Sequence, residues 1–410
     1  MDQSDSKVKI EKGKKVISDF GYNIIATMAV TIVLQMIVYP YLAASFSADV
    51  YGQLLTIMGI ANIFAVSLGG GLNNVRLIQK NLYEEQDITG DYNPLLILSS
   101  SISILIFGFI VVVQFEIRGM SIFLLLFYML IGIIENYWAV AYRIVINYKA
   151  NLIYNIMLSA GYLVGIILAR EIGNWTIAFV MGELFGLFYL LKSTSLYKEK
   201  LKVTPLFAST MKAYFILIGT NLIANIVNYL DRIFLYPILG GEQVTIYTVS
   251  SFVGKSIGLL ITPVAGVLLS YYAQKSFKMT LKKYWVINGI TILVGGTAGG
   301  VAMIAAPWIT ALLYPTVFGS ANPYLLIANI ASLIGALTNI LSPSVLKFAN
   351  ISWQIVIQGI YAIAYMGLGY AFMISHGLFG FCMATLLVNL IRMVLLMFIG
   401  HFSIWRREGE

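Results

Sequence analysis

One face of a long apolar segment near the middle of the chain carries three amides and a guanidinium group. The residues are Asn221, Asn225, Asn228 and Arg232, at spacings of four, three and four residues. In an α-helix these spacings bring the side chains to one face, because each residue turns the helix by about 100°. Amide and guanidinium groups bind sugar hydroxyls and phosphate oxygens. The face therefore favours a hydrated cavity, and hydrogen bonding between packed helices is the alternative.

A second polar face follows in the next apolar segment and contains a lysine. It consists of Thr248, Ser251, Lys255 and Thr262. Packing of apolar helices requires neither a lysine nor an arginine at mid-depth. Lys255 and Arg232 together therefore indicate a cavity that attracts an anion, such as a pyrophosphate or an acidic sugar. Asp231 adjoins Arg232 and would partly neutralise it.

The first apolar segment carries a looser polar row that we also assign to this cavity. Its members are Asn23, Thr27, Thr31 and Gln35, spaced four residues apart. Such a row drifts around a helix by about 40° per step. Of the four, Gln35 is our candidate for contact with the bound molecule.

Three further ionisable residues, Glu135, Glu183 and Arg392, lie inside apolar segments. An ionised side chain that faces lipid costs roughly 2.5–3.5 kcal/mol, so these residues must face protein or water. We add Glu183 and Arg392 to the candidate cavity residues. Because the charges of all six intramembrane residues sum to zero, three structural ion pairs are the alternative. Whether Glu183 binds a proton stays open.

The composition requires that lipid surrounds most of the chain. Of its 410 residues, 59% are apolar and 11% are charged, against about 25% charged in soluble proteins. Apolar runs long enough to cross a bilayer core recur throughout. We predict an all-α membrane protein with about twelve spans, near residues 19–42, 53–75, 94–115, 120–142, 151–169, 174–191, 213–238, 245–270, 285–312, 324–345, 351–373 and 378–400.

The positions of the basic residues predict the orientation of these spans. With the N-terminus in the cytoplasm, 21 of the 26 basic residues fall on the inner side and two, Arg118 and Arg170, on the outer side. Both termini are then cytoplasmic. The net charge of +8 thus reflects membrane orientation, and we expect no nucleic-acid partner.

The chain divides into two halves of six spans each. We predict a six-helix lobe over residues 1–191, a cytoplasmic linker over 192–212 that carries five lysines, and a second six-helix lobe over 213–410. A Tyr-Pro pair at Tyr39 recurs at Tyr236, an offset of 197 residues. Because six is even, both halves enter the membrane in the same direction, which makes them parallel repeats.

Nothing in the sequence predicts catalysis or a bound cofactor. Two histidines and one cysteine cannot form a zinc site without carboxylates. The glycine clusters at 69–71 and 295–300 lack the Gly-Lys-Ser/Thr signature of a nucleotide site. We therefore expect a transporter without catalytic residues, metal or cofactor, in which the coupling ion, H⁺ or Na⁺, is undecided.

Several motifs resemble the polysaccharide-unit flippases of the multidrug/oligosaccharidyl-lipid/polysaccharide exporter superfamily. They are the run from Ile37 to Leu54, with a Pro40 turn before Tyr51-Gly52, and the run from Asn228-Tyr229-Leu230-Asp231 to Ile261-Thr262-Pro263. The resemblance implies two six-helix lobes around a central cavity and an alternating-access mechanism. The implied substrate is an undecaprenyl-pyrophosphate-linked oligosaccharide, and the implied location is the bacterial cytoplasmic membrane.

These implications leave two alternatives open. The same fold serves multidrug or small-cation exporters, although those typically place carboxylates in the first lobe's cavity, and spans one and two contain none beyond Asp19 at the boundary. A non-transporting scaffold in a polysaccharide assembly complex is the other alternative. Expected partners are the lipid-linked oligosaccharide, membrane lipid, a polysaccharide polymerase and glycosyltransferases.

Overall fold

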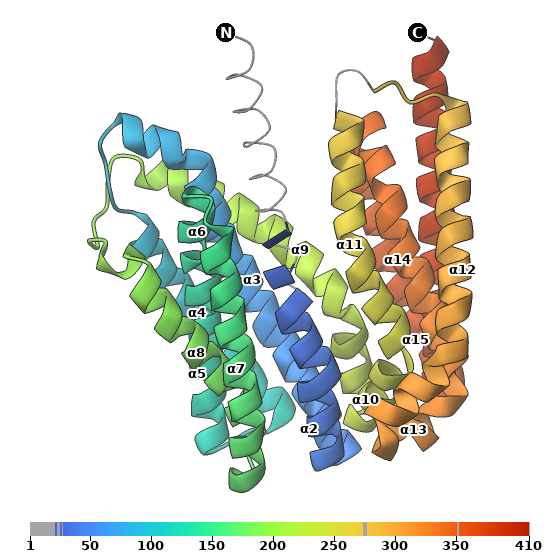
Figure 1. Cartoon of the computed structure of the whole chain (residues 1–410), viewed down its shortest axis with the longest axis horizontal. Helices are drawn as coiled ribbons and strands as arrows, with labels where there is room; N and C mark the ends of the chain where they lie inside the picture. The colour runs from blue at the N-terminus through green and yellow to red at the C-terminus, as the bar shows by residue number, and fades with distance from the viewer. Residues whose placement is uncertain (1–20, 23–24, 27, 274–276, 351, 410) are drawn as a thin grey trace, which may run out of the picture. The chain divides into compact units, whose positions relative to one another are not determined.

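The structure, a computed structural model, consists of helices joined by short connections (Figure 1). It describes residues 1–410 except 1–20, 23–24, 27, 274–276, 351 and 410. The described part of the chain contains no strand. Its elements are η1 (Leu34–Val38), α2 (Tyr39–Ser45), α3 (Ala48–Glu85), α4 (Tyr92–Phe115), α5 (Met120–Trp138), α6 (Val140–Ile144), α7 (Tyr148–Ile172), α8 (Thr176–Ser193), η2 (Leu196–Lys198), α9 (Phe207–Leu239), α10 (Gly241–Ser250), α11 (Phe252–Ala273), α12 (Leu281–Leu313), α13 (Pro315–Ala321), η3 (Asn322–Tyr324), α14 (Leu325–Phe348) and α15 (Ser352–Gly409).

The predicted all-α membrane fold is confirmed. Among the described residues, 10 helical segments are long and apolar enough to cross a membrane. One of them, Trp353–Glu408, contains non-helical backbone at His376 and Gly377 and corresponds to two predicted spans. The helix α11 corresponds to the predicted eighth span. Dividing the broken segment and adding α11 gives twelve segments that match the predicted spans in order.

Some helices extend beyond the predicted apolar spans by up to ten residues. The second span is predicted to end near residue 75, and α3 continues to Glu85, because polar residues with good helix propensity extend the helix beyond its apolar part. The predicted turn at Pro40 is wrong. Pro40 lies in the first turn of α2, where a missing N–H is tolerated, and the helix ends at Ser45.

Three sequence predictions lie outside the described residues. These are the N-terminal lysines, the pair Asn23 and Thr27 of the polar row, and the side chain of Thr262 in the second polar face.

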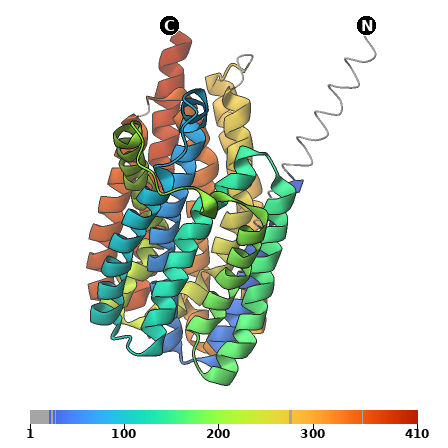
Figure 2. The same cartoon turned by 90° about the vertical axis from the view of Figure 1, so that its left-hand side faces the viewer.

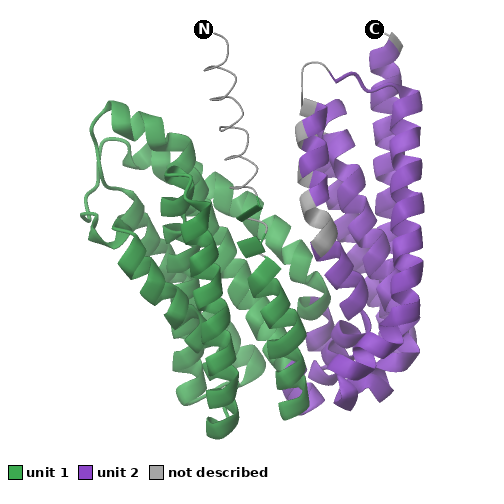
Figure 3. Ribbon diagram, in the orientation of Figure 1, with its two compact units in different colours: residues 1–46, 53–233 green, residues 47–52, 234–410 purple. Residues whose placement is uncertain are grey.

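The chain separates into two compact units, shown in green and purple in Figure 3. Unit 1 comprises residues 1–46 and 53–233, and unit 2 comprises residues 47–52 and 234–410. Most of α9 therefore packs with the first six spans. The lobe boundaries expected from the sequence stay a prediction.

In unit 1, α3 is deeply buried: 72% of the residues in its most apolar stretch are buried. Figure 2 shows unit 1 from the front, with α3 in blue among teal and green helices. The helices α7 and α8 pack closely because glycines face the neighbouring backbone. A Cβ atom on Gly161 would lie 2.5 Å from the carbonyl oxygen of Met181, and one on Gly165 would lie 2.5 Å from that of Ala178. Close approach at small residues is the usual way in which membrane helices pack.

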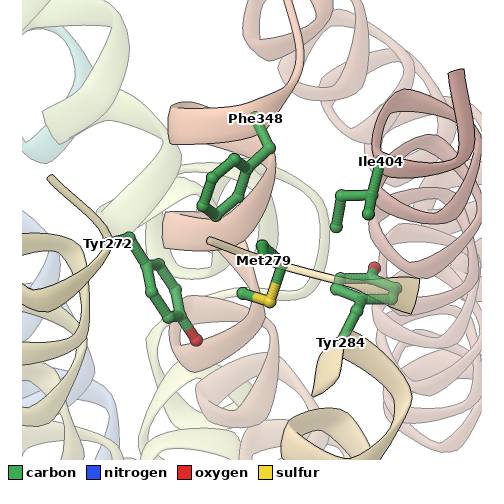
Figure 4. Packing of buried hydrophobic residues seen from close by; sticks show 5 residues of the cluster. All are labelled: Tyr272, Met279, Tyr284, Phe348 and Ile404. Carbon is green, nitrogen blue, oxygen red and sulfur yellow. The ribbon is translucent and has the colours of Figure 1, made fainter. Parts of the chain in front are cut away.

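Unit 2 packs α14 between α11 and α15. At one end an apolar cluster joins α11, α12, α14 and α15; it is formed by Tyr272, Met279, Tyr284, Phe348 and Ile404 (Figure 4). The Tyr284 hydroxyl donates to the carbonyl of Met397 at 3.0 Å. By contrast, α12 exposes Trp308 and Leu312 by 79% and 80%. Such an apolar outer face is expected of a helix that lies against lipid.

One contact in unit 2 joins two positions related by the 197-residue offset. The Thr245 hydroxyl donates to the carbonyl oxygen of Ala48 at 2.5 Å. Gly52 lies against Gly241 so closely that a Cβ atom on Gly52 would overlap the Gly241 carbonyl. These contacts hold the start of α3 against α10, and the internal repeat stays a prediction.

Candidate functional site

The amide face of α9 is partly used for contact with α3. Asn225 donates to the carbonyl of Asn221 at 2.8 Å and to the Ser67 hydroxyl at 3.3 Å. Both asparagines are half-buried, whereas Asn228 is exposed. The N-terminal part of the amide face, with Asn221 and Asn225, thus contributes to helix packing, as the alternative interpretation expects. The Asn228 amide lies on the surface of unit 1.

The Arg232 side chain contacts the backbone of α3 and an aromatic ring of α9. Its Nη1 donates to the carbonyl of Leu55 at 3.3 Å, and its Cζ lies 5.7 Å from the centre of the Tyr229 ring. Gly59 makes room for that ring, because a Cβ atom there would lie 3.0 Å from it. The backbone N–H of Arg232 donates to the carboxylate of buried Asp231 at 2.9 Å. Arg232 itself is half-buried.

Lys255 has a similar environment in unit 2. Its Nζ lies 4.8 Å from the centre of the buried Tyr247 ring, and the side chain is half-buried. The neighbouring Gly254 donates its N–H to the Asn329 side chain at 2.7 Å, which fixes α11 against α14. Ser251 is buried where α10 meets α11 and donates to the carbonyl of Thr248 at 3.3 Å.

Arg392 is the third basic residue that lies over a tyrosine. Its Cζ is 4.9 Å from the centre of the Tyr361 ring, and its Nε has no hydrogen-bond partner among the described residues. A cation over an aromatic face is stabilised without losing its charge. Gln35, the last of the candidates from the first span, is half-buried in the π-helical η1.

Glu183 lies in unit 1 among tyrosines and beside Glu135. The Tyr162 hydroxyl donates to Glu183 at 2.8 Å, and the Tyr154 hydroxyl donates to Glu135 at 2.9 Å. The two carboxyl groups interact with each other. In the described part of the chain these glutamates contact tyrosines rather than cations, so the ion-pair interpretation does not describe them.

The structure therefore groups the candidates by unit. In unit 1 it brings together Asn221, Asn225, Asp231 and Arg232 along α9, and it places Glu183 with Glu135. Unit 2 contains Ser251, Lys255 and Arg392. The joint anion site of Arg232 and Lys255 thus draws on both units and stays a prediction. None of the described histidines, cysteines, aspartates and glutamates form a group of three that could hold a metal ion.

A polar cluster where α3, α4 and the 194–206 connection meet was not predicted. Asp91 is fully buried and accepts hydrogen bonds from the Thr204 N–H at 2.7 Å, the Tyr83 hydroxyl at 2.6 Å and the Thr204 hydroxyl. Nearby, Arg76 forms an ion pair with Glu199 and lies over the Tyr92 ring. Contacts such as these attach the predicted linker to unit 1.

A cavity of about 260 Å³ adjoins this cluster. Its lining includes Arg76, Lys80, Tyr92 and Glu199. Arg143 donates to the side chains of Asn73 and Asn74, at 2.7 and 3.1 Å. Both arginines thus have partners within unit 1. The sequence offered no motif for these contacts, because they join distant residues: Arg76 and Glu199 are 123 positions apart, and Arg143 and Asn73 are 70.

The tyrosines around Glu135 and Glu183 could have been found from the sequence. Tyr154 and Tyr162 are eight residues apart, which places both near one face of a helix.

Comparison with solved structures identifies the fold. The chain resembles the "Lipid II flippase MurJ, inward closed conformation" with a TM-score of 0.63 at 18% identity, covering 94% of this chain and 86% of that one. It resembles a "multidrug resistance MATE family transporter of the MOP superfamily" in an outward-facing conformation with a TM-score of 0.58 at 13% identity, covering 95% of each chain. For MATE in complex with MaD5 the TM-score is 0.59 at 14% identity, covering 95% and 97%.

No family model matches the chain. No curated protein matches it either. At identities below 20%, these similarities show the fold alone, a multi-span helical membrane fold that the chain shares with the structures named above.

Proposed function

We propose that the chain is a flippase that moves an undecaprenyl-pyrophosphate-linked oligosaccharide across the bacterial cytoplasmic membrane by alternating access. The observation that carries this proposal is the placement of basic residues. Arg232, Lys255 and Arg392 all lie in membrane helices, each over a tyrosine ring. The similarity in fold to a structure named as a lipid II flippase supports this proposal, because lipid II is a lipid-linked substrate.

In the proposed mechanism, the two units supply different contacts. Arg232 in unit 1 and Lys255 in unit 2 attract the pyrophosphate, since aromatic faces leave their charges intact. Asn228, the exposed amide of α9, exchanges hydrogen bonds with sugar hydroxyls. The polyprenyl chain stays in lipid, where it loses no apolar contacts. We assign no residue a catalytic role, and the similar structures are named as a flippase and a transporter.

The test is translocation by the double variant Arg232→Ala/Lys255→Ala. We expect it to abolish surface glycan in cells and translocation of a lipid-linked oligosaccharide in proteoliposomes, while the protein still reaches the membrane. Lys192→Ala provides a matched control, because Lys192 is an exposed lysine at the end of α8. Normal export by the double variant would contradict the proposed role of the two cations.

A multidrug or small-cation exporter is the second candidate, and one observation favours it. The buried carboxyl groups of Glu135 and Glu183 form an acidic site in unit 1, and MATE transporters share the fold. Drug-resistance assays in a host without its own pumps separate the two functions. Resistance that depends on the chain, without any effect on glycan export, would favour the exporter.

The remaining expectations follow from the flippase proposal. We propose that both termini are cytoplasmic and that residues 192–212 join a lobe of residues 1–191 to one of residues 213–410. A polysaccharide polymerase and glycosyltransferases would be partners, and neighbouring genes for them would support the flippase. H⁺ or Na⁺ would be the coupling ion, with no other cofactor.

A further inference from the structure

Two carboxyl groups meet in the interior of unit 1. Glu135 on α5 is 1% exposed and Glu183 on α8 is 7% exposed. The Glu135 carboxyl lies against α8 one turn beyond Glu183, where Gly186 leaves room for it: a Cβ atom on Gly186 would lie 2.7 Å from Glu135 Oε1. Gly186 is one helical turn from Glu183, so the two carboxyl groups lie near each other and each acts electrostatically on the other. Chain segments 48 residues apart thus converge on one acidic pair.

This pair has fewer donors than it has oxygen atoms. Tyr154 donates to Glu135 Oε2 and Tyr162 donates to Glu183 Oε1, both from α7. Glu135 Oε1 is buried and has no hydrogen-bond partner among the described residues. A buried carboxylate oxygen without a donor is costly, so its state in the folded protein requires an explanation.

The groups around the pair do not supply the missing charge. Tyr128 from α5 and Tyr142 from α6 also lie near the pair, and Tyr39 from α2 and Tyr229 from α9 lie near Tyr128. The positive charge of Arg232 acts on two of these tyrosines, Tyr39 and Tyr229. Asp231 adds a further negative charge beside Tyr229. Within the described residues, neither glutamate forms an ion pair.

A bound proton accounts both for the oxygen atom that lacks a donor and for the negative charges that lack a cation. Two carboxylates in contact in a medium of low dielectric constant cannot both be ionised, and such pairs share a proton. When one carboxyl group carries a proton, it becomes a donor to the other, and Glu135 Oε1 gains the partner that it lacks. A shared proton therefore explains how the two carboxyl groups can be buried next to each other and how Glu135 Oε1 obtains a partner.

We propose that Glu135 and Glu183 form a proton-binding site, which shares one proton at neutral pH and exchanges a second with water during transport. No bond other than O–H forms or breaks, and the second proton comes from the more acidic side of the membrane. The binding of protons rests on the geometry of unit 1 alone. Its use to drive translocation rests on the proposed function.

Infrared spectroscopy of the full-length protein in lipid tests the binding. The protonated-carboxyl stretch is recorded as a function of pH for the wild type and for Glu135→Gln/Glu183→Gln. We expect the difference between the two to show one protonated carboxyl group at neutral pH and two at acidic pH. Two ionised carboxylates at neutral pH, or two groups protonated across the whole range, would overturn the proposal. Loss of the neutral-pH band on addition of sodium chloride would assign the site to Na⁺ and overturn it as well.

Two further variants keep this measurement interpretable. If the double variant does not fold, Glu183→Gln alone serves, because the glutamine amide then donates to Glu135 in place of the shared proton: the neutral-pH band should be absent and the acid-induced band should remain. Glu171→Gln is the matched control, since Glu171 is an exposed carboxylate on α7 in the same unit. It should leave both bands unchanged.

A transport measurement tests the coupling separately. In proteoliposomes that contain a labelled lipid-linked oligosaccharide, a pH gradient should accelerate translocation several-fold for the wild type and for Glu171→Gln. It should not accelerate translocation by Glu135→Gln/Glu183→Gln, in which neither residue of the pair can exchange a proton, and a sodium gradient should affect none of them. Translocation that ignores the pH gradient would contradict the coupling, whereas no translocation by any variant would contradict the proposed function and leave the infrared result standing.

Discussion

Unit 1 contains two kinds of buried carboxyl site, and they differ in how completely their oxygens are satisfied. Asp91 is fully buried and accepts hydrogen bonds from three donors. The pair Glu135 and Glu183 is buried to a similar degree, but two tyrosine donors serve four oxygens, and one oxygen has none. Burial alone therefore does not distinguish the two sites; the number of donors does.

The difference indicates two different tasks. A carboxyl group that is saturated by fixed donors holds chain segments together, because each donor would be left unsatisfied without it. A carboxyl pair with too few donors costs stability unless it binds something, which is typical of a functional site. Asp91 joins the α3–α4 connection to the segment 194–206 between α8 and α9, whereas the glutamates accept from tyrosines of α7.

The largest effect is expected for Asp91→Ala. It would leave the Thr204 N–H, the Thr204 hydroxyl and the Tyr83 hydroxyl without their acceptor, at a cost of roughly 3–5 kcal/mol. Unfolding in detergent micelles would measure this loss, and limited proteolysis would show earlier cleavage within residues 194–206. Asp91→Asn should lose less, because its amide oxygen still accepts. An unchanged unfolding free energy for Asp91→Ala would remove the distinction between the two sites.

A smaller loss is expected for Glu199→Gln, which weakens the second attachment of the same segment. Arg76 also donates to the Tyr137 hydroxyl at 2.5 Å and lies over Tyr92, so it keeps two partners. Because the two charged side chains are 15% and 21% exposed, water screens them in part, and we expect about 1–2 kcal/mol.

The exposed pair of Lys80 and Glu84 is the matched control for this variant. Its side chains are 37% and 64% exposed, and breaking it should cost only about 0.3–0.5 kcal/mol. Equal losses for Glu199→Gln and Glu84→Gln would show that the attachment through Arg76 contributes no more than a surface ion pair.

The two carboxyl sites also show how far the sequence leads. Hydropathy and the distribution of basic residues predicted the spans, because lipid requires about 20 apolar residues per crossing. Glu135 and Glu183 were recognised as intramembrane charges, since each interrupts an apolar run. Their contact could not be predicted, because it depends on glycines such as Gly186 that set how closely α5 approaches α8. Nothing in the sequence distinguished Asp91, since aspartates are common in polar connections between helices.

A modest effect is expected when the glutamates lose their tyrosine donors. Tyr154→Phe and Tyr162→Phe each remove one hydrogen bond and keep the ring, so each should cost about 1 kcal/mol. Tyr214→Phe is the matched control: its hydroxyl donates to the Leu68 carbonyl at 3.2 Å, remote from any carboxyl group. We expect all three variants to unfold similarly, but only the first two to change the pH dependence of transport. A pH profile that Tyr162→Phe leaves unchanged would argue against the proton site.

The smallest effect is expected for Glu135→Gln and Glu183→Gln. Glutamine has nearly the shape of a protonated glutamic acid, and its amide can donate to the neighbouring carboxyl group as the shared proton does. If the pair already carries that proton, the substitution replaces one neutral donor by another, and the unfolding free energy should stay within about 0.5 kcal/mol of the wild type. If both carboxyl groups were ionised and held by partners, as Asp91 is held, the variants would instead lose stability as Asp91→Asn does. Parallel unfolding of Glu183→Gln and Asp91→Asn at neutral pH therefore measures the difference between the two sites directly.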